Sequence, residues 1–259
     1  MDKTTETQDG IALTDGKLIF YNDNFEVVKE IDCLEENKSY KNALGYGEQF
    51  YYASYDTKES VIKDMHDIYN KNGELIYTAL SNKIDLWEQD GNEYLLCKTD
   101  DGKVLINSDG EQKFSVDSET EILKSTVNGI FYTKNEEGVR IYKSDTMEAY
   151  NDEVYEYSYE GVAFKKGDYL VFNKEGQTCT LKKEDDVQLT GVQFLLNGYV
   201  AFNVMKGNEW CKYILDVSGK GDVVEIPYEA SFSEIVPCYS VGKVYYDYDG
   251  NVIIDANTF

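Results

Sequence analysis

Short runs of apolar and aromatic residues alternate with tight polar turns along the whole chain. One pair of runs and its turn recurs seven times, and five of these turns carry a glycine at the fourth position. The turns start at Asn22, Asn70, Asn107, Lys143, Asn173, Asp216 and Asp247. Asn, Asp and Gly accept the positive φ angles that tight hairpins need. Each copy therefore predicts two antiparallel strands, and a spacing of about forty residues is typical of repeated small sheets.

Each hairpin belongs to a longer unit of four strands, A to D. In the third unit, strands are expected over residues 84–87, 93–97, 104–106 and 113–116, with a glycine-bearing turn between each pair. The same order predicts units over 10–32, 42–80, 83–117, 120–150, 153–183, 187–227 and 230–257. The first unit has room for three strands, and its missing strand A is expected from residues 2–9 or from the C-terminus.

Helical periodicity is nearly absent. Residues 58–68 have mild helical spacing, but a strand or loop is expected there. The longest connection without strand character is expected over residues 33–41. Four-stranded antiparallel sheets that repeat in this way bury their faces against one another around a common axis. We therefore expect an all-β fold, a single β-propeller over residues 10–259 with seven blades (six is the alternative), preceded by a flexible tether over 1–9.

The turn at residues 246–253 (YDYDGNVI) is similar to the Y-D-x-x-G-x-h-h pattern of bacterial propeller repeats of the WG type. At the level of this blade pattern, nearly the whole chain resembles the secreted or lipoprotein β-propellers of gut bacteria. It lacks the recurring Trp-Asp pair, the Gly-Gly pair and the Tyr-Trp-Thr-Asp run of other propeller families. The resemblance implies the propeller fold and transfers no catalytic residue.

The charge of the chain narrows the set of partners. Forty-nine acidic residues against twenty-five basic ones give a formal net charge of −24. A field of this sign repels phosphate backbones, so no nucleic-acid partner is expected, and anionic membrane surfaces are disfavoured. Solubility is the plain explanation of such a charge; attraction of basic proteins or divalent cations is the alternative.

Metal and cofactor sites find little support. The five cysteines are scattered and the chain has one histidine, His66, so the usual zinc sets are absent. The acidic turns lack the carboxylate that completes a calcium loop. We expect no metal and no cofactor, a structural role for His66, and mostly buried strand cysteines; a disulfide between adjacent blades remains open.

No apolar run approaches the roughly 20 residues of a membrane-spanning helix, and no signal peptide is present. Residues 1–8 (MDKTTETQ) are polar and rich in threonine. They resemble a tether that follows a removed export signal, which predicts an extracytoplasmic protein with a lipid anchor upstream. An ordinary frayed terminus is the alternative.

No nucleophile elbow, metalloprotease motif or phosphate-binding loop occurs. In a propeller the D–A and B–C connections meet on one face of the ring, and tyrosines there suit ligand binding. The predicted ligand-binding residues are Tyr40, Tyr55, Asp56, Tyr150, Asp152, Tyr228 and Phe232. Trp87 and Trp210 are expected in the core.

Three classes of function remain. We expect a monomeric, non-catalytic binding propeller that recognises a protein, peptide or glycan. The alternative is a glycoside hydrolase or lyase with paired carboxylates at the mouth of the channel. An assembly module is the third.

Overall fold

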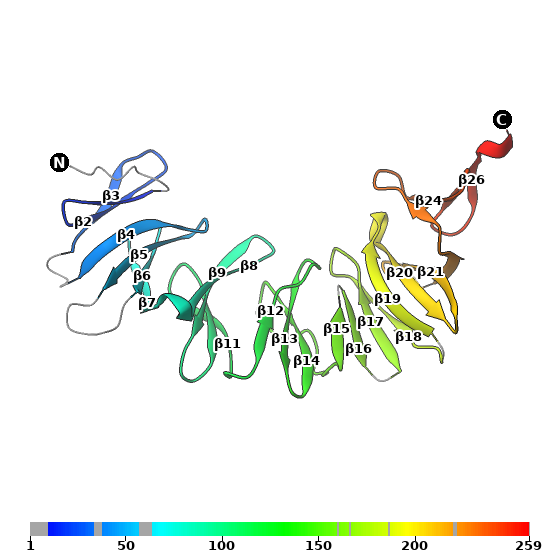
Figure 1. The fold of residues 1–259 in the computed structure, drawn as a ribbon, viewed down its shortest axis with the longest axis horizontal. Helices are drawn as coiled ribbons and strands as arrows, with labels where there is room; N and C mark the ends of the chain where they lie inside the picture. Colours follow the sequence, from blue (N-terminus) through cyan, green and yellow to red (C-terminus); the bar gives the residue numbers. More distant parts are fainter. Residues whose placement is uncertain are drawn as a thin grey trace. The chain divides into compact units, whose positions relative to one another are not determined.

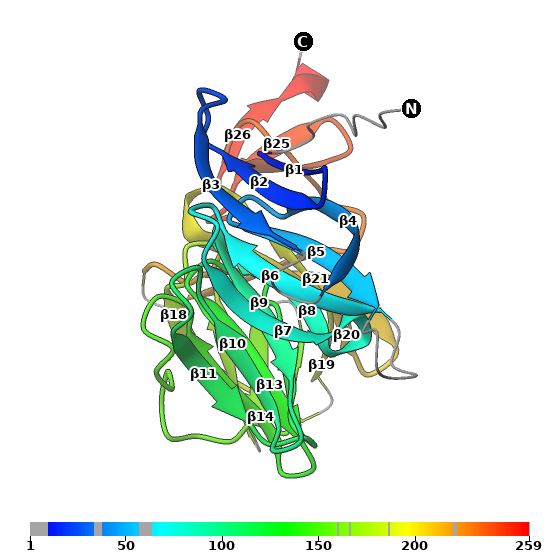
Figure 2. The same cartoon turned by 90° about the vertical axis from the view of Figure 1, so that its left-hand side faces the viewer.

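The computed structural model describes residues 10–33, 38–56, 64–159, 161–165, 167–185, 187–219 and 222–258. In these ranges the strands form seven antiparallel sheets, numbered here 1 to 7 in chain order (Figures 1 and 2). Every sheet keeps its strands in chain order. The chain divides into two compact units, Met1–Thr120 and Glu121–Phe259. The expectation of an all-β fold is confirmed, whereas a single domain over 10–259 stays a prediction.

The first unit holds sheets 1 to 3. Sheet 1 consists of β1 (Ile11–Thr14), β2 (Lys17–Tyr21) and β3 (Val27–Asp32). Sheet 2 consists of β4 (Ser39–Tyr46), β5 (Phe50–Asp56), β6 (Met65–Asn70) and β7 (Leu75–Leu80). After a 3₁₀ turn (Ser81–Lys83), sheet 3 follows with β8 (Ile84–Gln89), β9 (Asn92–Lys98), β10 (Lys103–Ile106) and β11 (Gln112–Val116). Sheet 1 has three strands, as the sequence predicted; the proposed source at 2–9 lies outside the described residues.

The second unit holds sheets 4 to 7. Sheet 4 consists of β12 (Glu121–Leu123), β13 (Ile130–Asn135) and β14 (Gly138–Lys143), and sheet 5 of β15 (Tyr157–Tyr159), β16 (Val162–Lys165), β17 (Asp168–Phe172) and β18 (Thr178–Lys182). Sheet 6 consists of β19 (Val187–Phe194), β20 (Tyr199–Lys206), β21 (Glu209–Asp216) and β22 (Val223–Pro227), with a 3₁₀ turn (Leu196–Gly198) after β19. Sheet 7 consists of β23 (Ser231–Phe232), β24 (Cys238–Val241), β25 (Val244–Asp247) and β26 (Val252–Asp255), followed by a 3₁₀ turn (Ala256–Thr258).

Two local features differ from the expectation. Sheet 4 has three strands among the described residues, and only isolated bridges, Tyr142 to Ala149 and Val139 to Tyr155, follow its last strand. Strand β4 begins at Ser39, inside the segment predicted to be a connection. A bulge between Tyr40 and Asn42 breaks the alternation of side chains there, which hides the strand from the sequence pattern. Residues 34–37 and 57–63 lie outside the described residues.

The recurring turn owes its shape to one side chain. The Asn70 Oδ1 atom accepts hydrogen bonds from the backbone N–H groups of Asn72 (3.0 Å) and Glu74 (2.9 Å), and the Gly73 N–H binds the Asn70 carbonyl. Asn22, Asn107, Asn173 and Asp247 accept the equivalent bond from the residue four positions later. An Asx side chain thus replaces a missing backbone partner, which explains why Asn and Asp recur there.

Each inner sheet of a unit buries both of its faces. Along β5 in sheet 2, Tyr51 and Ala53 pack with sheet 1, and Phe50 packs with sheet 3. In the second unit, sheet 6 behaves in the same way: Tyr213 faces sheet 5, and Ile214 faces sheet 7. Strands buried on both faces need apolar residues at successive positions. The candidate site lies between two such packed sheets, sheets 6 and 7.

Candidate functional site

One face of β21 passes from solvent into the core within five residues. Trp210, Lys212 and Ile214 share this face because side chains alternate along a strand. The exposed fraction is 47% at Trp210 and 0% at Ile214, and Lys212 between them is half-buried. The face therefore offers an open aromatic rim, a cation below it, and an apolar floor.

Lys212 joins β21 to the connection between sheets 6 and 7. Its Nζ atom donates a hydrogen bond to the Ala230 carbonyl at 2.5 Å. The same atom lies 5.4 Å from the centroid of the Tyr228 ring and 5.5 Å from that of Phe232. Burial lowers the pKa of Lys212 from its usual value, against the attraction of Glu229. Contacts of an ammonium with aromatic faces offset part of the cost of burial.

The rim is an exposed aromatic pair. The rings of Trp210 and Tyr228 lie 5.6 Å apart at an interplanar angle of 47°. Tyr228 is 46% exposed. Trp210 stands at the β20–β21 hairpin, and Tyr228 belongs to the β22–β23 connection. A B–C hairpin and a D–A connection thus meet here.

A cavity of about 310 Å³ lies beside this pair on the same side of sheet 6. It is lined by Gly191, Val192, Gln193, Ala201, Phe202, Asn203, Lys212 and Phe232. Gln193 and Asn203 contribute amide groups that both donate and accept hydrogen bonds. Lys212 contributes an ammonium, and Phe232 contributes an aromatic wall. The volume is at the low end of the range of about 300–1,000 Å³ that is common for small-molecule sites.

A bulge in β19 makes room for one of these amides. The pairing of β19 with β20 shifts between Leu189 and Val192, and Gly191 has a φ of +137°. A Cβ atom on Gly191 would lie 2.8 Å from the Asn203 Nδ2 atom. The glycine therefore allows both the irregular backbone and the close approach of the Asn203 side chain.

The chemistry of this site favours binding. No carboxylate is among the described residues that line the cavity. Hydrolysis of a glycoside by the usual route needs two carboxyl groups, so this cavity does not provide that machinery. Across the described ranges, no group of three His, Cys, Asp or Glu side chains is placed to hold a metal ion.

The structure brings two predicted ligand-binding residues together at this site, Tyr228 and Phe232. Tyr150 and Asp152, also in the second unit, lie in the β14–β15 connection. The Tyr150 ring packs edge-on against Phe172 at 5.4 Å, and its hydroxyl lies 3.2 Å from the Thr178 Oγ1 atom. Asp152 is exposed. Tyr150 therefore packs against its own sheet neighbours, and its role toward a ligand stays a prediction.

The other three predicted residues, Tyr40, Tyr55 and Asp56, lie in strands of sheet 2 rather than in connections. The Tyr40 and Tyr55 rings pack edge-on at 5.2 Å. Asp56 ends β5, forms an ion pair with Lys41 and accepts a hydrogen bond from the Asp64 N–H at 3.3 Å. Their role toward a ligand stays a prediction.

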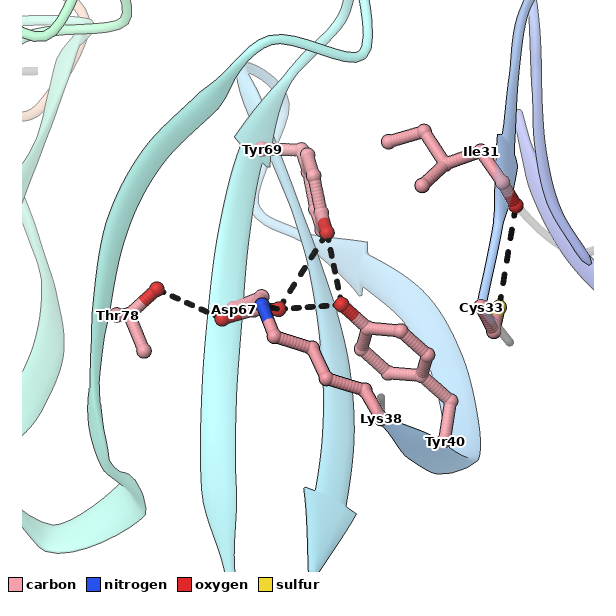
Figure 3. A network of polar contacts seen from close by, with 7 residues as sticks. All are labelled: Ile31, Cys33, Lys38, Tyr40, Asp67, Tyr69 and Thr78. Carbon is pink, nitrogen blue, oxygen red and sulfur yellow. Dashed lines mark hydrogen bonds and ion pairs between the residues drawn. The ribbon is translucent and has the colours of Figure 1, made fainter. Parts of the chain in front are cut away.

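A fully buried carboxylate organises this part of the first unit (Figure 3). Asp67 accepts hydrogen bonds from Lys38 Nζ at 2.6 Å and Thr78 Oγ1 at 2.7 Å, and also from the hydroxyls of Tyr40 and Tyr69. Burial, followed by the bond to Asp67, raises the pKa of Tyr40; burial, followed by the charge of Asp67, raises the pKa of Tyr55 to about 12. Both phenols therefore stay neutral near pH 7, and Tyr40 serves as one of the donors to Asp67.

Among the remaining expectations for single residues, the structure confirms one for tryptophan and corrects another. Trp87 is buried, as predicted, with 2% of its surface exposed. Trp210 was predicted to lie in the core, and the structure corrects this, because it occupies the solvent end of β21. His66 lies in β6 and stacks on Tyr52 at 4.9 Å. Cys97 and Cys238 are buried in β9 and β24.

Sequence reasoning missed Gln193, Asn203 and Lys212. A signal was present for Lys212, because it shares an alternating face with an apolar residue two positions later. A glycine inside the β19 pattern, Gly191, is a sign of a bulge. Gln193 and Asn203 gave no sign, since amides on strands are common on solvent faces. Among the described residues, no helix is both long and apolar enough to span a bilayer.

Comparison with known proteins assigns no family to the chain. No family model and no curated protein matches the sequence. Among solved structures, Hsv2p of Kluyveromyces lactis is similar with a TM-score of 0.33 and 11% identity, over 95% of this chain and 94% of that one. A post-proline cleaving enzyme of Rickettsia typhi gives a TM-score of 0.37 and 9% identity, over 96% and 53% of the two chains. PorZ of Porphyromonas gingivalis, a surface component of the type-IX secretion system, gives 0.31 and 11%, over 95% and 41%.

Proposed function

We propose that this protein is a non-catalytic binding propeller and that it recognises a glycan at the Trp210–Tyr228 rim and the adjoining cavity. The observation that carries the proposal is an exposed aromatic pair beside a cavity with two amide side chains and one ammonium. Among the partners expected from the sequence, which also included proteins and peptides, a glycan fits this combination best.

The parts of the site suit a sugar ring. The C–H groups of a pyranose pack on an aromatic face, and Trp210 and Tyr228 each expose nearly half of their surface. Sugar hydroxyls both donate and accept hydrogen bonds, as do the amides of Gln193 and Asn203. Lys212 adds donors only. Because Lys212 is already held by the Ala230 carbonyl and two rings, little further ordering is needed on binding.

A combined glycan and peptide array, followed by isothermal titration calorimetry, tests this function. Trp210→Ala and Asn203→Ala are each expected to weaken binding of the selected glycan about tenfold, or about 1.4 kcal/mol. Tyr245→Ala is the control, because Tyr245 is 43% exposed and lies outside the site. Equal binding by all three variants, or selection of peptides with no glycan, would reject the proposal.

The proposal extends to the architecture, in which the seven sheets are the blades of one seven-bladed propeller over residues 10–259. Support comes from seven antiparallel sheets with strands in chain order. A single compact domain of this length has a radius of gyration of about 18 Å. Small-angle X-ray scattering measures this quantity, and a value well above it would contradict a closed ring.

We also propose that the protein is exported and tethered at a bacterial surface as a monomer. The polar, threonine-rich residues 1–8 support a tether. The gene sequence upstream and the mass of the mature N-terminus test it. A start codon at Met1 with no lipid on the mature protein would argue against it.

A further inference from the structure

Lys212, in the glycan site proposed above, is a half-buried ammonium without a carboxylate partner. Among the described residues it takes part in no ion pair, although the chain has 49 acidic residues. Glu229 attracts this charge from an exposed position without forming an ion pair with it. One N–H of the ammonium binds the Ala230 carbonyl, and two further donors remain. Because burial removes hydration from a charge, an anionic partner would offset that cost.

The register of sheet 6 places two amide side chains on the same face as Lys212. Asn203 on β20 is directly opposite Lys212 on β21, so their side chains project side by side, with Cβ atoms about 5 Å apart. Gln193 on β19 is opposite Ala201, and Ala201 is opposite Ile214, so Gln193 lies on this face one row further into the core. This is the face of sheet 6 that packs with sheet 7.

The two amides keep their hydrogen-bonding groups for a ligand. Neither the Gln193 side chain nor the Asn203 side chain has a hydrogen-bond partner among the described residues; the bond from Thr190 Oγ1, at 3.3 Å, goes to the Asn203 backbone carbonyl. Both residues line the cavity of about 310 Å³ together with Lys212, and no carboxylate is among its described lining residues. The cavity therefore combines one ammonium and two amides, all with unused donors.

The acidic groups elsewhere in sheet 6 do not compete for Lys212. Glu225 is opposite Tyr213, the neighbour of Lys212 on β21, so it lies on the other face, where it pairs with Lys206 at 3.3 Å. The net charge of −24 repels anions from a distance, but physiological salt screens such a field beyond about 8 Å. The acidic chain therefore opposes a polyanion more than a ligand with a single charge.

We propose that the glycan bound at this site carries a carboxylate, as uronic and sialic acids do, and that Lys212 and the Asn203 amide hold it. This inference rests on the proposed function and adds the class of sugar. A carboxylate brings one negative charge to one ammonium, and its hydrogen bonds with a charged donor are about twice as strong as neutral ones. A phosphate group would bring up to about two charges near pH 7.

The aromatic rim lies within reach of the same sugar residue. Trp210 precedes Lys212 by two residues on one face of β21, which is about 7 Å along the strand. A pyranose ring packed on Trp210 and Tyr228 can therefore direct its carboxylate toward Lys212.

Calorimetric titration with matched sugars tests the inference. The probes are the methyl glycosides of glucuronic, galacturonic and N-acetylneuraminic acid, each beside its neutral carboxamide. At least one acid is expected to bind about tenfold more tightly than its carboxamide. If sugars bind but no acid exceeds its carboxamide, the carboxylate is wrong and the glycan site stands. If no sugar binds, both proposals fail. Tighter binding of hexaglutamate than of every acid would assign the carboxylate to a peptide and overturn the inference.

Variants locate the carboxylate. Lys212→Gln keeps a donor for the Ala230 carbonyl but removes the charge, so the preference for acid over carboxamide is expected to disappear. Asn203→Asp gives Lys212 a carboxylate from the protein itself and should abolish the preference as well. Trp210→Ala should weaken acid and carboxamide by the same factor, and Lys134→Gln, at an exposed lysine on β13, should change neither. Thermal unfolding shows which variants remain folded. A preference that persists in either of the first two variants, or that is lost in Lys134→Gln, would overturn the assignment.

Discussion

At the scale of single residues, the recurring turns require a left-handed backbone at their fourth position, and one copy has a bulky residue there. In four copies of the turn, the fourth position is a glycine with a positive φ. Gly73, Gly110, Gly176 and Gly250 have φ values of 72°, 80°, 82° and 88°. The first copy has Phe25 there, with a φ of 61° and 79% of its surface exposed. A bulky residue in this region is strained, and its exposed ring gains little packing in return.

Replacing Phe25 with glycine is expected to stabilise the protein. The left-handed backbone costs an L-residue roughly 1–2 kcal/mol, and the greater freedom of glycine in the unfolded chain removes part of that gain. We expect a net increase of about 0.5–1 kcal/mol in the free energy of unfolding, measured by urea denaturation. Phe25→Ala is the control and should gain less, because alanine keeps the strain. Equal gains from both variants would show that removal of the ring was the cause.

Asp67 is the residue whose loss should cost most in the first unit. It is fully buried and accepts bonds from four side chains (Figure 3). Asp67→Asn removes the charge that Lys38 pairs with, and breaking a buried pair typically costs about 3–5 kcal/mol. Urea denaturation should show a loss in this range, and Tyr40→Phe, which removes one donor, should lose about 1 kcal/mol. A loss below 1 kcal/mol for Asp67→Asn would contradict the role assigned to the network.

At the scale of elements, the bulge in β19 shows how an irregular strand positions a functional group. Gly191→Ala is expected to strain the backbone and to displace the Asn203 amide. Gly207→Ala is a matched control, since Gly207 also has a positive φ (62°) but a Cβ atom there meets nothing within 4 Å. Both variants should lose about 1 kcal/mol of stability, and only Gly191→Ala should also weaken glycan binding. Equal glycan binding by both would show that the cavity does not depend on the bulge.

Elements were also the level at which the sequence was most informative. Apart from the end of sheet 4, the sheet boundaries were predicted to within a few residues because turn chemistry is local: an Asn such as Asn70 shapes its own hairpin whatever surrounds it. Whether one face of a strand is buried depends instead on the neighbouring sheet, so the local sequence does not determine it. Trp210 was placed in the core because strand alternation does not tell how far along β21 the neighbouring sheet reaches. Lys38, which helps to bury Tyr55, lies outside any strand pattern.

At the scale of the whole molecule, adjacent repeats carry different chemistry at related positions. A cavity between sheets 5 and 6 lies beside the connection from β18 to β19, and the aromatic rim includes the connection from β22 to β23. Both are D–A connections. A repeat architecture allows one such position to change its residues while the sheets stay the same.

The many tyrosines give the whole protein a dependence on alkaline pH. Burial raises the pKa of both Tyr55 and Tyr169 to about 12, whereas an unperturbed tyrosine has a pKa of about 10. The folded protein then holds these protons where the unfolded chain releases them, so stability is retained below pH 10 and falls between about pH 10 and 12. Absorbance at 295 nm should show tyrosines that ionise late. Urea denaturation at several pH values should show a shallower fall for Tyr55→Phe, and an unchanged slope would speak against the shift at Tyr55.

The sequential order of strands within every sheet has a consequence for how the chain acquires its structure. Each sheet pairs only segments that are close in sequence, so its contact order is low for an all-β protein. Only small loops need to close before pairing begins. A nascent chain can therefore complete one sheet before the next is synthesised, and within each unit a finished sheet offers an apolar face on which its successor assembles.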